Sequence, residues 1–318
     1  MAIPFKQTIF VAFIVASFLF TSCKSHKPSV TLLQIKEVNY PSGSGLSFYK
    51  NKIYLIGDDA AQLWVMDTAL NVSDSIRVHD SATHRIAWQV KHDYEDIANV
   101  RIGRSQFFFM AGSGSGGAYR NAALLINAET HEEKKYALDT FYTRLKMFGL
   151  KDINIEGSAE LPAGMLLSNR GNKGYQKNYL VFTDRNFWAH PDSCDFTIIL
   201  VGTTKDSSNF NGISGLEYAQ KSDKLLLSVS TENTYSNLAD GAIGKSYLWI
   251  INDISNKKNY SAINPNLIID LEAADARFKG HKIEAVTILQ ENKKSMVLLF
   301  ISDDDDGKSI LFKVRLDL

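Results

Sequence analysis

The stretch Ser44-Gly45-Leu46-Ser47-Phe48, with the apolar run Lys52-Ile53-Tyr54-Leu55-Ile56 close behind it, contains a pattern that recurs along the chain. A small or acidic residue comes first, then Gly, Ala or Asp and a short strand, and a second, more apolar strand follows. Such self-similarity is typical of repeat architectures. Four more copies occur, at Glu95-Asp96-Ile97-Ala98 with 106–110, Glu156-Gly157-Ser158-Ala159 with 165–168, Ser214-Gly215-Leu216-Glu217-Tyr218 with 224–228, and Glu284-Ala285-Val286-Thr287-Ile288 with 296–300.

The spacing of the copies favours a propeller. Their starts lie 51 to 70 residues apart, within reach of the roughly 40 to 50 residues of propeller repeats once loops lengthen. The fifth copy ends after 309–316, one strand short of four, and the N-terminal run 31–38 is the spare strand. Pairing these two segments would close a ring and cover an exposed edge. We therefore predict an all-β protein, a five-bladed β-propeller closed by an N-terminal strand.

Each of the first four units also contains a predicted third and fourth strand. They are expected at 62–66 and 75–78, 122–126 and 134–138, 178–182 and 196–200, and 246–251 and 266–270. An open β-sandwich and a six-bladed ring with one divergent blade are the alternatives, but a single sandwich rarely needs this many strands. One segment differs, because Phe141, Leu145 and Phe148 have helical spacing and predict a short helix over 141–150.

Composition excludes several functional classes. The 318 residues contain 35 Lys plus Arg and 35 Asp plus Glu, and this zero formal charge argues against nucleic-acid binding. Two cysteines cannot form a disulfide-rich scaffold or a cysteine-based zinc site. We expect a monomer that is held together by ordinary apolar packing.

The N-terminus has the features of an export signal. Lys6 is the only charge in 1–22, and the apolar stretch 9–20 ends shortly before Cys23. Its 12 residues are too few to span a hydrocarbon core of about 30 Å. The pattern resembles a bacterial lipoprotein signal, with an ordinary secretory signal as the alternative.

The expected organisation follows from this signal. It is a lipoprotein signal peptide over 1–22, a lipidated tether over 23–30 and a single propeller domain over 31–318. Lipid on Cys23 would attach the protein to a membrane of the cell envelope. Lys24 stands where aspartate would signal inner-membrane retention, so the outer membrane is the expected location.

The first residues of the five repeats are candidate metal ligands. In a propeller the first strand of each blade runs beside the central channel, so equivalent residues form a ring. Carboxylates gathered at one depth repel one another, and burial raises their pKa unless a cation compensates. Calcium, which takes about 6 to 8 oxygen ligands, is the predicted metal, and the alternative is that these side chains only hydrogen-bond backbone. The ring is Ser44, Glu95, Glu156, Ser214 and Glu284.

The order Ser, Glu, Glu, Ser, Glu in this ring resembles the calcium-activated nucleotidase (apyrase) family, five-bladed propellers with one central calcium. Gly57-Asp58-Asp59 and Tyr94-Glu95 are similar to stretches of that family. Glu156-Gly157-Ser158-Ala159, followed by 167–172, also resembles the phytase-like esterase propellers. The resemblance implies a central calcium and hydrolysis of phosphoesters. The arginine that follows the paired aspartates in the nucleotidases is replaced here by Ala60.

Candidate catalytic residues lie where the second strands end, on the same rim as the ring. Asp58 or Asp59 would act as general base on a water molecule, and Arg170 would stabilise a phosphate or anionic leaving group. Aspartate and asparagine are also ordinary turn residues, which is the alternative interpretation. Because the nucleotidase arginine is missing, we expect first a cell-envelope propeller lipoprotein with a central calcium site and a ligand-binding rim. A calcium-dependent phosphoester hydrolase and a protein-interaction platform are the alternatives.

Overall fold

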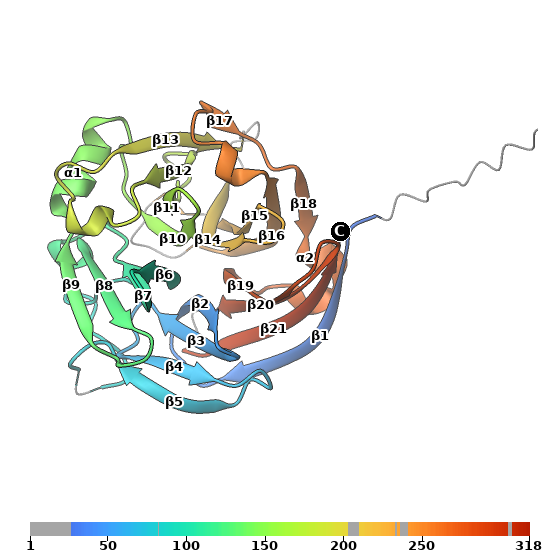
Figure 1. The fold of residues 1–318 in the computed structure, drawn as a ribbon. Coiled ribbons are helices and arrows are strands. Elements are labelled where there is room, and N and C mark those ends of the chain that lie inside the picture. The colour runs from blue at the N-terminus through green and yellow to red at the C-terminus, as the bar shows by residue number, and fades with distance from the viewer. Residues whose placement is uncertain (1–26, 82, 203–209, 233, 236–240, 305–306) are drawn as a thin grey trace, which may run out of the picture.

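The computed structural model describes residues 27–318 except 82, 203–209, 233, 236–240 and 305–306. Its strands form five sheets arranged around a central axis, and each sheet is one blade of a propeller (Figure 1). Within a blade, successive strands pair antiparallel from the axis outward. The predicted five-bladed β-propeller is therefore confirmed, and the sandwich and six-bladed alternatives are wrong.

The blades follow one another along the chain. Blade 1 contains β2 (Gly43–Tyr49), β3 (Lys52–Gly57), β4 (Gln62–Met66) and β5 (Val72–Arg77). Blade 2 contains β6 (Ala98–Ile102), β7 (Ser105–Ala111), β8 (Ala122–Asn127) and β9 (Glu133–Ala137). Blade 3 contains β10 (Ile155–Leu161), β11 (Gly164–Asn169), β12 (Asn178–Thr183) and β13 (Phe196–Val201), with β17 (Ala262–Ile263) added parallel at its edge. Blade 4 contains β14 (Asn211–Ala219), β15 (Lys224–Glu232), β16 (Ile243–Asn252) and β18 (Leu267–Asp270).

Blade 5 closes the ring with strands from both ends of the chain. It contains β19 (Ile283–Glu291), β20 (Ser295–Asp303), β21 (Ser309–Asp317) and β1 (Ser29–Val38). β1 pairs antiparallel with β21 from Ser29 opposite Asp317 to Val38 opposite Ser309, and Figure 1 shows the two strands side by side. This confirms the predicted N-terminal closure. The pairing covers the edge of β21 that would otherwise be open.

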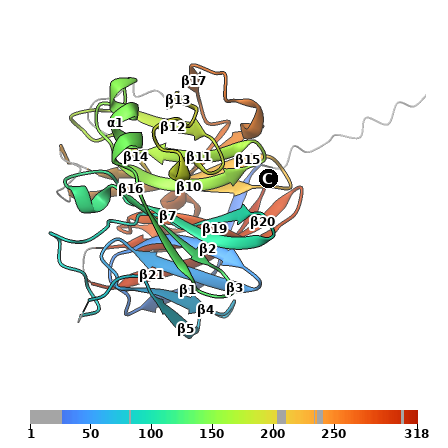
Figure 2. The same cartoon turned by 60° about the vertical axis from the view of Figure 1, so that its left-hand side comes forward.

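Apolar clusters fill the spaces between neighbouring blades, with one cluster at each of the five interfaces. Between blades 1 and 2, for example, Phe108 packs against Tyr54 with ring centroids 4.1 Å apart. Both faces of a typical blade are therefore buried, which explains why the second strand of each repeat is so apolar. Figure 2 shows the same blades turned by 60°, with the sheets seen more nearly from the side.

One α-helix reinforces the interface of blades 2 and 3. α1 (Asp139–Met147) buries Phe141, Tyr142 and Leu145 in that cluster. It ends before the predicted limit of residue 150 because Gly149 adopts a φ of 106°, a left-handed conformation that terminates helices. The remaining helical segments are short: α2 (Leu271–Ala274) and the 3₁₀ turns Ala118–Arg120, Phe187–Ala189, Ile254–Asn256 and Ala276–Phe278. Within the described ranges, no helix is long and apolar enough to cross a membrane.

Four of the five ring residues stand at β-bulges. The pairing between the first two strands of blades 1, 3, 4 and 5 skips one residue near its start. A bulge leaves its extra residue outside the ladder and re-aims that side chain. The skipped residues are Ser44, Glu156, Ser214 and Glu284. In blade 2, Glu95 precedes β6 and lies outside the ladder as well.

The residue after each ring position brings the inner strands together. These residues are Gly45, Asp96, Gly157, Gly215 and Ala285. A Cβ atom on Gly45 would lie 2.7 Å from the Asp96 Cα, and one on Gly157 would lie 2.9 Å from the Leu216 nitrogen. Neighbouring inner strands are therefore in contact here, and the channel narrows below the ring.

Candidate functional site

A polar cavity opens at the end of the axis where the first strands begin and the second strands end. Its volume is about 380 Å³. Among the residues that the structure describes, eight acidic and five basic side chains line it, so carboxylates are in excess there. They are Asp58, Asp59, Asp93, Glu95, Glu156, Glu232, Glu284 and Asp303, with Arg85, Lys91, Arg120, Arg170 and Lys282. We call this space the axial cavity.

The repeat explains which residues reach the axial cavity. Four of the five ring residues line it, and so do all five residues that lie two positions earlier. Residues two apart in an extended chain point to the same side, so four of the blades offer two side chains in turn, and blade 4 contributes only the backbone of its glycine. The earlier positions are Ser42, Asp93, Asn154, Gly212 and Lys282.

On the side of blades 1 and 2, acids and bases alternate in what we call the first ion-pair chain, Asp58–Lys91–Asp93–Arg120. The Lys91 ammonium contacts the Asp58 carboxylate and lies 2.8 Å from Asp93 Oδ1. Arg120 Nη1 lies 2.9 Å from Asp93 Oδ2, which also accepts a hydrogen bond from the Ser113 hydroxyl. Both oxygens of Asp93 are thus engaged, whereas Asp58 Oδ1 is buried and has no hydrogen-bond partner within the part of the chain that the structure describes.

On the side of blades 3 to 5 lies the second ion-pair chain, Glu156–Arg170–Glu232–Lys282–Glu284. Arg170 Nη2 lies 2.8 Å from Glu232 Oε2, and Arg170 Nη1 lies 3.7 Å from Glu156 Oε2. Lys282 Nζ lies 2.8 Å from Glu284 Oε1 and 3.5 Å from Glu232 Oε2. Each base therefore stands between two acids from neighbouring blades.

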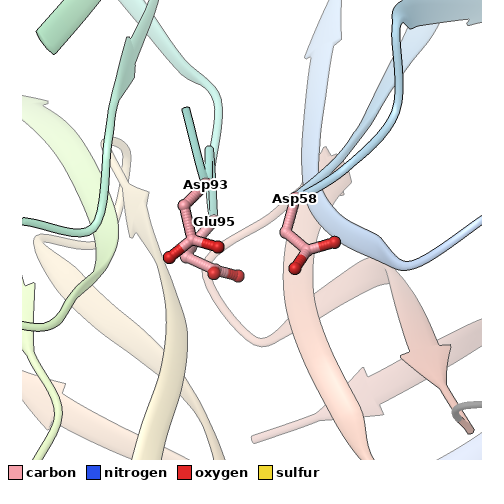
Figure 3. A group of neighbouring side chains, drawn as sticks. All are labelled: Asp58, Asp93 and Glu95. Carbon is pink, nitrogen blue, oxygen red and sulfur yellow. The ribbon is translucent and has the colours of Figure 1, made fainter. Parts of the chain in front are cut away.

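Glu95 belongs to neither chain. It is half-buried, and no hydrogen bond or ion pair joins its carboxyl group to any residue that the structure describes. Figure 3 shows its side chain beside Asp93 and facing Asp58 across the axial cavity. One ligand oxygen from each of these three carboxyl groups can be chosen so that all lie within 4.8 Å of one another. This is a candidate cation site made entirely of oxygen atoms.

The proton affinities in the axial cavity reflect burial and crowding. Burial, with Asp93, Glu156 and Asp58 nearby, raises the pKa of Glu95 well above its usual value. Burial raises the pKa of Asp58 to about 6, although Lys91 opposes the shift, and it raises the pKa of Glu156 to about 8 against the effect of Arg170. These carboxyl groups lack enough positive charge to ionise as they would in water.

The other predicted site residues lie as follows. Ser44 lines the axial cavity but donates its hydroxyl hydrogen to Tyr94 O at 2.8 Å. Ser214 is buried outside the cavity lining, and its hydroxyl lies 2.9 Å from that of Ser230. Asp59 lines the cavity and pairs with Arg85 at 2.6 Å. Cys23 lies outside the described residues, so its predicted lipidation stays a prediction.

Sequence reasoning missed several charged residues of the site. Asp93 and Lys282 could have been found, because each stands two positions before a ring glutamate. Lys91 and Arg120 come from connections outside the repeated strands, and no feature of the repeat marks them. The missed bases matter for the predicted calcium ring, because two of its glutamates, Glu156 and Glu284, already have basic partners.

Fold and site together define a five-bladed β-propeller with a charged cavity on its axis. The chain belongs to a family of unknown function, DUF6929, whose model matches residues 39–316. No curated protein matches the chain. The resemblance to nucleotidases and phytase-like esterases stays a prediction, because the matched family carries no assigned activity.

Some solved structures are similar over most of the chain. Glutaminyl cyclase from Myxococcus xanthus is 9% identical, with a TM-score of 0.48, and the match covers 91% of this chain and 97% of that one. Virginiamycin B lyase from Staphylococcus aureus is 8% identical, with a TM-score of 0.34 and coverage of 92% and 100%. A streptogramin B lyase is 9% identical, with a TM-score of 0.37 and coverage of 89% and 96%.

Proposed function

We propose that this protein is a binding protein whose axial cavity takes a hard divalent cation, calcium, together with a small polar ligand at the cavity mouth. The observation that carries the proposal is Glu95. It is a half-buried carboxyl group without an ion-pair partner among the described residues, within ligand distance of Asp58 and Asp93. A cation there would compensate the charge that burial and neighbouring carboxylates now disfavour.

The donor set fits calcium. Asp58, Asp93 and Glu95 offer only oxygen atoms, which hard cations prefer, and no histidine or cysteine takes part. The Lys91 ammonium group lies against Asp58 and Asp93, so it acts as the counter-ion when no metal is bound. Calcium would compete with this ammonium group, and Lys91 would have to move aside.

This proposal shifts the predicted calcium site within the ring. Glu95 is common to the predicted ring and the group of three carboxylates, whereas Glu156 and Glu284 have basic partners and the Ser214 hydroxyl faces Ser230. The site would therefore lie off the axis, on the side of blades 1 and 2, rather than at the centre of the ring.

The side chains at the mouth of the axial cavity indicate what kind of ligand would bind there. Trp88 lines the axial cavity with 58% of its surface exposed, and amide and hydroxyl side chains such as Asn154 and Ser42 line it too. The excess of carboxylates repels anions. A neutral or cationic polar molecule with an apolar face that stacks on the indole ring suits these walls better than a phosphoester.

Hydrolysis of a phosphoester is the second candidate, and one observation favours it. Burial raises the pKa of Asp58 to about 6, and one of its buried oxygens has no hydrogen-bond partner among the described residues, as suits a general base. Arg170, however, already pairs with Glu232 and Glu156, which leaves it poorly placed to hold a phosphate. Assays with nucleoside diphosphates and generic phosphoesters, with and without calcium, test this candidate. Turnover that Asp58→Asn reduces by more than about 100-fold would support it.

The binding function is tested by calcium-dependent stability. Metal-free protein is heated with and without millimolar calcium, with magnesium and the chelated sample as references. We expect a rise in the melting temperature with calcium, because a ligand that binds only the folded state stabilises it. The absence of any rise, together with no calcium in metal analysis of the purified protein, would refute the proposal.

The proposal includes a lipid anchor on Cys23 that places the propeller at the outer membrane of a bacterial cell. It rests on the apolar stretch 9–20 and the cysteine that follows it. Fractionation of cells that express Cys23→Ala tests the anchor. Release of this variant from the membrane fraction is expected, and retention there would refute lipidation at this residue.

A further inference from the structure

We propose that the opposite end of the axis holds a second and independent binding site for a small zwitterion, which places its ammonium group at Glu217 and its carboxylate at Arg101. A cavity of about 500 Å³ opens there, lined mainly by blades 2, 3 and 4, with blade 1 at its edge. Its wall includes Tyr49, Asn99, Arg101, Glu160, Arg185, Glu217 and Tyr218. We call it the opposite cavity.

The two cavities are separate. No residue that the structure describes lines both of them. Between them lies the level at which the inner strands touch, where a Cβ atom on Gly215 would lie 2.6 Å from the Glu284 carbonyl oxygen. Asp96 lies at the same level and accepts a hydrogen bond from the Ser158 N–H at 2.6 Å. A ligand in one cavity is therefore not in contact with the other.

Glu217 is an exception within the repeat. It stands three positions after the ring residue of blade 4, and the equivalent residues of the other blades are small and uncharged. Those residues are Ser47, Ala98, Ala159 and Thr287. Since four blades fold with small neutral side chains at this level, the propeller itself does not require a carboxyl group there. Small neighbours also leave room beside it for a ligand.

Glu217 lacks a basic partner. None of the ion pairs among the described residues includes it. Burial raises its pKa well above the usual value, Asp96 and Glu291 add to the shift, and only the Thr287 hydroxyl favours the ionised form. An ammonium group beside the Glu217 carboxylate would supply the missing positive charge.

The other charges of the opposite cavity leave one guanidinium group available. Glu160 pairs with Arg185 at 3.1 Å and accepts the Arg101 backbone N–H at 2.9 Å. The exposed Arg101 side chain itself forms no ion pair with any residue the structure describes. One unpaired group of each sign thus lines the same cavity, which is the arrangement that a zwitterion complements.

The chemistry of the walls narrows the ligand class. Glu160 is already paired with Arg185, and the one remaining carboxylate is too few for a tightly held metal ion, which needs several ligands. A guanidinium group binds a carboxylate through two parallel hydrogen bonds. Tyr49 and Tyr218 contribute aromatic surface for the carbon chain between the two charges. Amino acids with the amine at the α-carbon or at the end of a short chain have these features.

Calorimetric titration in the presence of a calcium chelator tests the inference without depending on the axial cavity. The probes are glycine, γ-aminobutyrate and ε-aminocaproate, which vary the distance between the charges, and butylamine and butyrate carry one charge each. We expect one of the amino acids to bind, and each single-charge probe to bind at least about tenfold more weakly. No binding by any of the amino acids at millimolar concentration would overturn the proposal.

Variants locate the site. Glu217→Gln keeps the shape of the side chain and Arg101→Gln changes an exposed residue, so both should fold, and each should weaken binding at least about tenfold. Glu95→Gln in the axial cavity is the matched control and should leave this affinity unchanged. An affinity that Glu217→Gln does not alter, or that Glu95→Gln reduces equally, would overturn the assignment. Calcium binding is measured separately, so failure of one proposal is distinguishable from failure of the other.

Discussion

The two sides of the axial cavity satisfy their charges to different degrees. In the second ion-pair chain, on blades 3 to 5, the Arg170 and Glu232 side chains are 9% and 8% exposed, and each base stands between two acids. In the first chain, the Arg120 and Asp93 side chains are buried as deeply, at 7% and 5% exposed. Its other end differs, because the Lys91 and Asp58 side chains are 14% and 21% exposed and Glu95 beside them has no partner among the described residues. The comparison indicates that the second chain holds the blades together, whereas the side of blades 1 and 2 has the capacity to take a cation.

Breaking the second chain should have the largest effect on stability. Arg170→Met would leave Glu156 and Glu232 buried without their shared base, and we expect a loss of about 3 to 5 kcal/mol in the free energy of unfolding. Urea denaturation measures it. Lys50→Met is the control, because Lys50 and Glu129 are 63% and 53% exposed in their pair, and its loss should cost less than about 1 kcal/mol. Equal losses in the two variants would contradict a structural role for the second chain.

Breaking the first chain should give a smaller loss that calcium reverses. Lys91→Met removes the ammonium group between Asp58 and Asp93, and we expect a loss of about 1 to 3 kcal/mol in metal-free protein. Calcium no longer competes with Lys91 in this variant, so its affinity should rise above that of the unaltered protein. Urea denaturation with and without calcium measures both effects. A loss that calcium leaves unchanged would mean that Lys91 has only a structural role.

The unpaired Glu95 should make stability depend on pH. Because burial and nearby carboxylates raise its folded-state pKa, the folded protein resists ionisation that the unfolded chain undergoes freely. The resulting loss in the free energy of unfolding is absent below the unfolded-state pKa of about 4.3, and it grows as pH rises toward the folded-state pKa. Metal-free Glu95→Gln should therefore be more stable than the unaltered protein near neutral pH and equally stable near pH 4. Denaturation curves at several pH values test this, and a variant that is less stable at neutral pH would contradict it.

The smallest effect is expected at Ser214. Its hydroxyl faces Ser230 at 2.9 Å and lies outside the axial cavity. Ser214→Ala should cost about 1 kcal/mol or less and leave calcium affinity unchanged. A marked drop in calcium affinity, measured by titration, would instead restore the complete five-residue ring as the metal site.

Sequence patterns predicted the fold because the information is local to each repeat. Strand length, apolar character and the turn residues between strands lie within each unit, and the missing strand of the last unit pointed to 31–38. The structure places β1 there. The α1 boundary was less predictable, since Gly149 and not apolar spacing ends the helix.

The sequence predicted which ring residues reach the axial cavity, but not which ion pairs they form there. Equivalence between repeats placed Ser44, Glu95, Glu156 and Glu284 at the axial cavity. The ion pairs join different blades, as between Arg170 and Glu232, or involve connections outside the repeat, as with Lys91. The sequence of one repeat does not tell which side chains of the neighbouring blade lie beside it. The basic residues that pair with the ring glutamates are therefore visible only in the structure.

Calorimetric titration of calcium into metal-free protein, compared between the unaltered chain and Glu95→Gln, tests the central claim most directly. We predict saturable binding at one site per chain in the unaltered protein, and loss of that binding in Glu95→Gln, whose amide cannot supply the third carboxylate. Absence of binding in the unaltered protein, or the same affinity in both proteins, would contradict the claim that the side of blades 1 and 2 is a cation site.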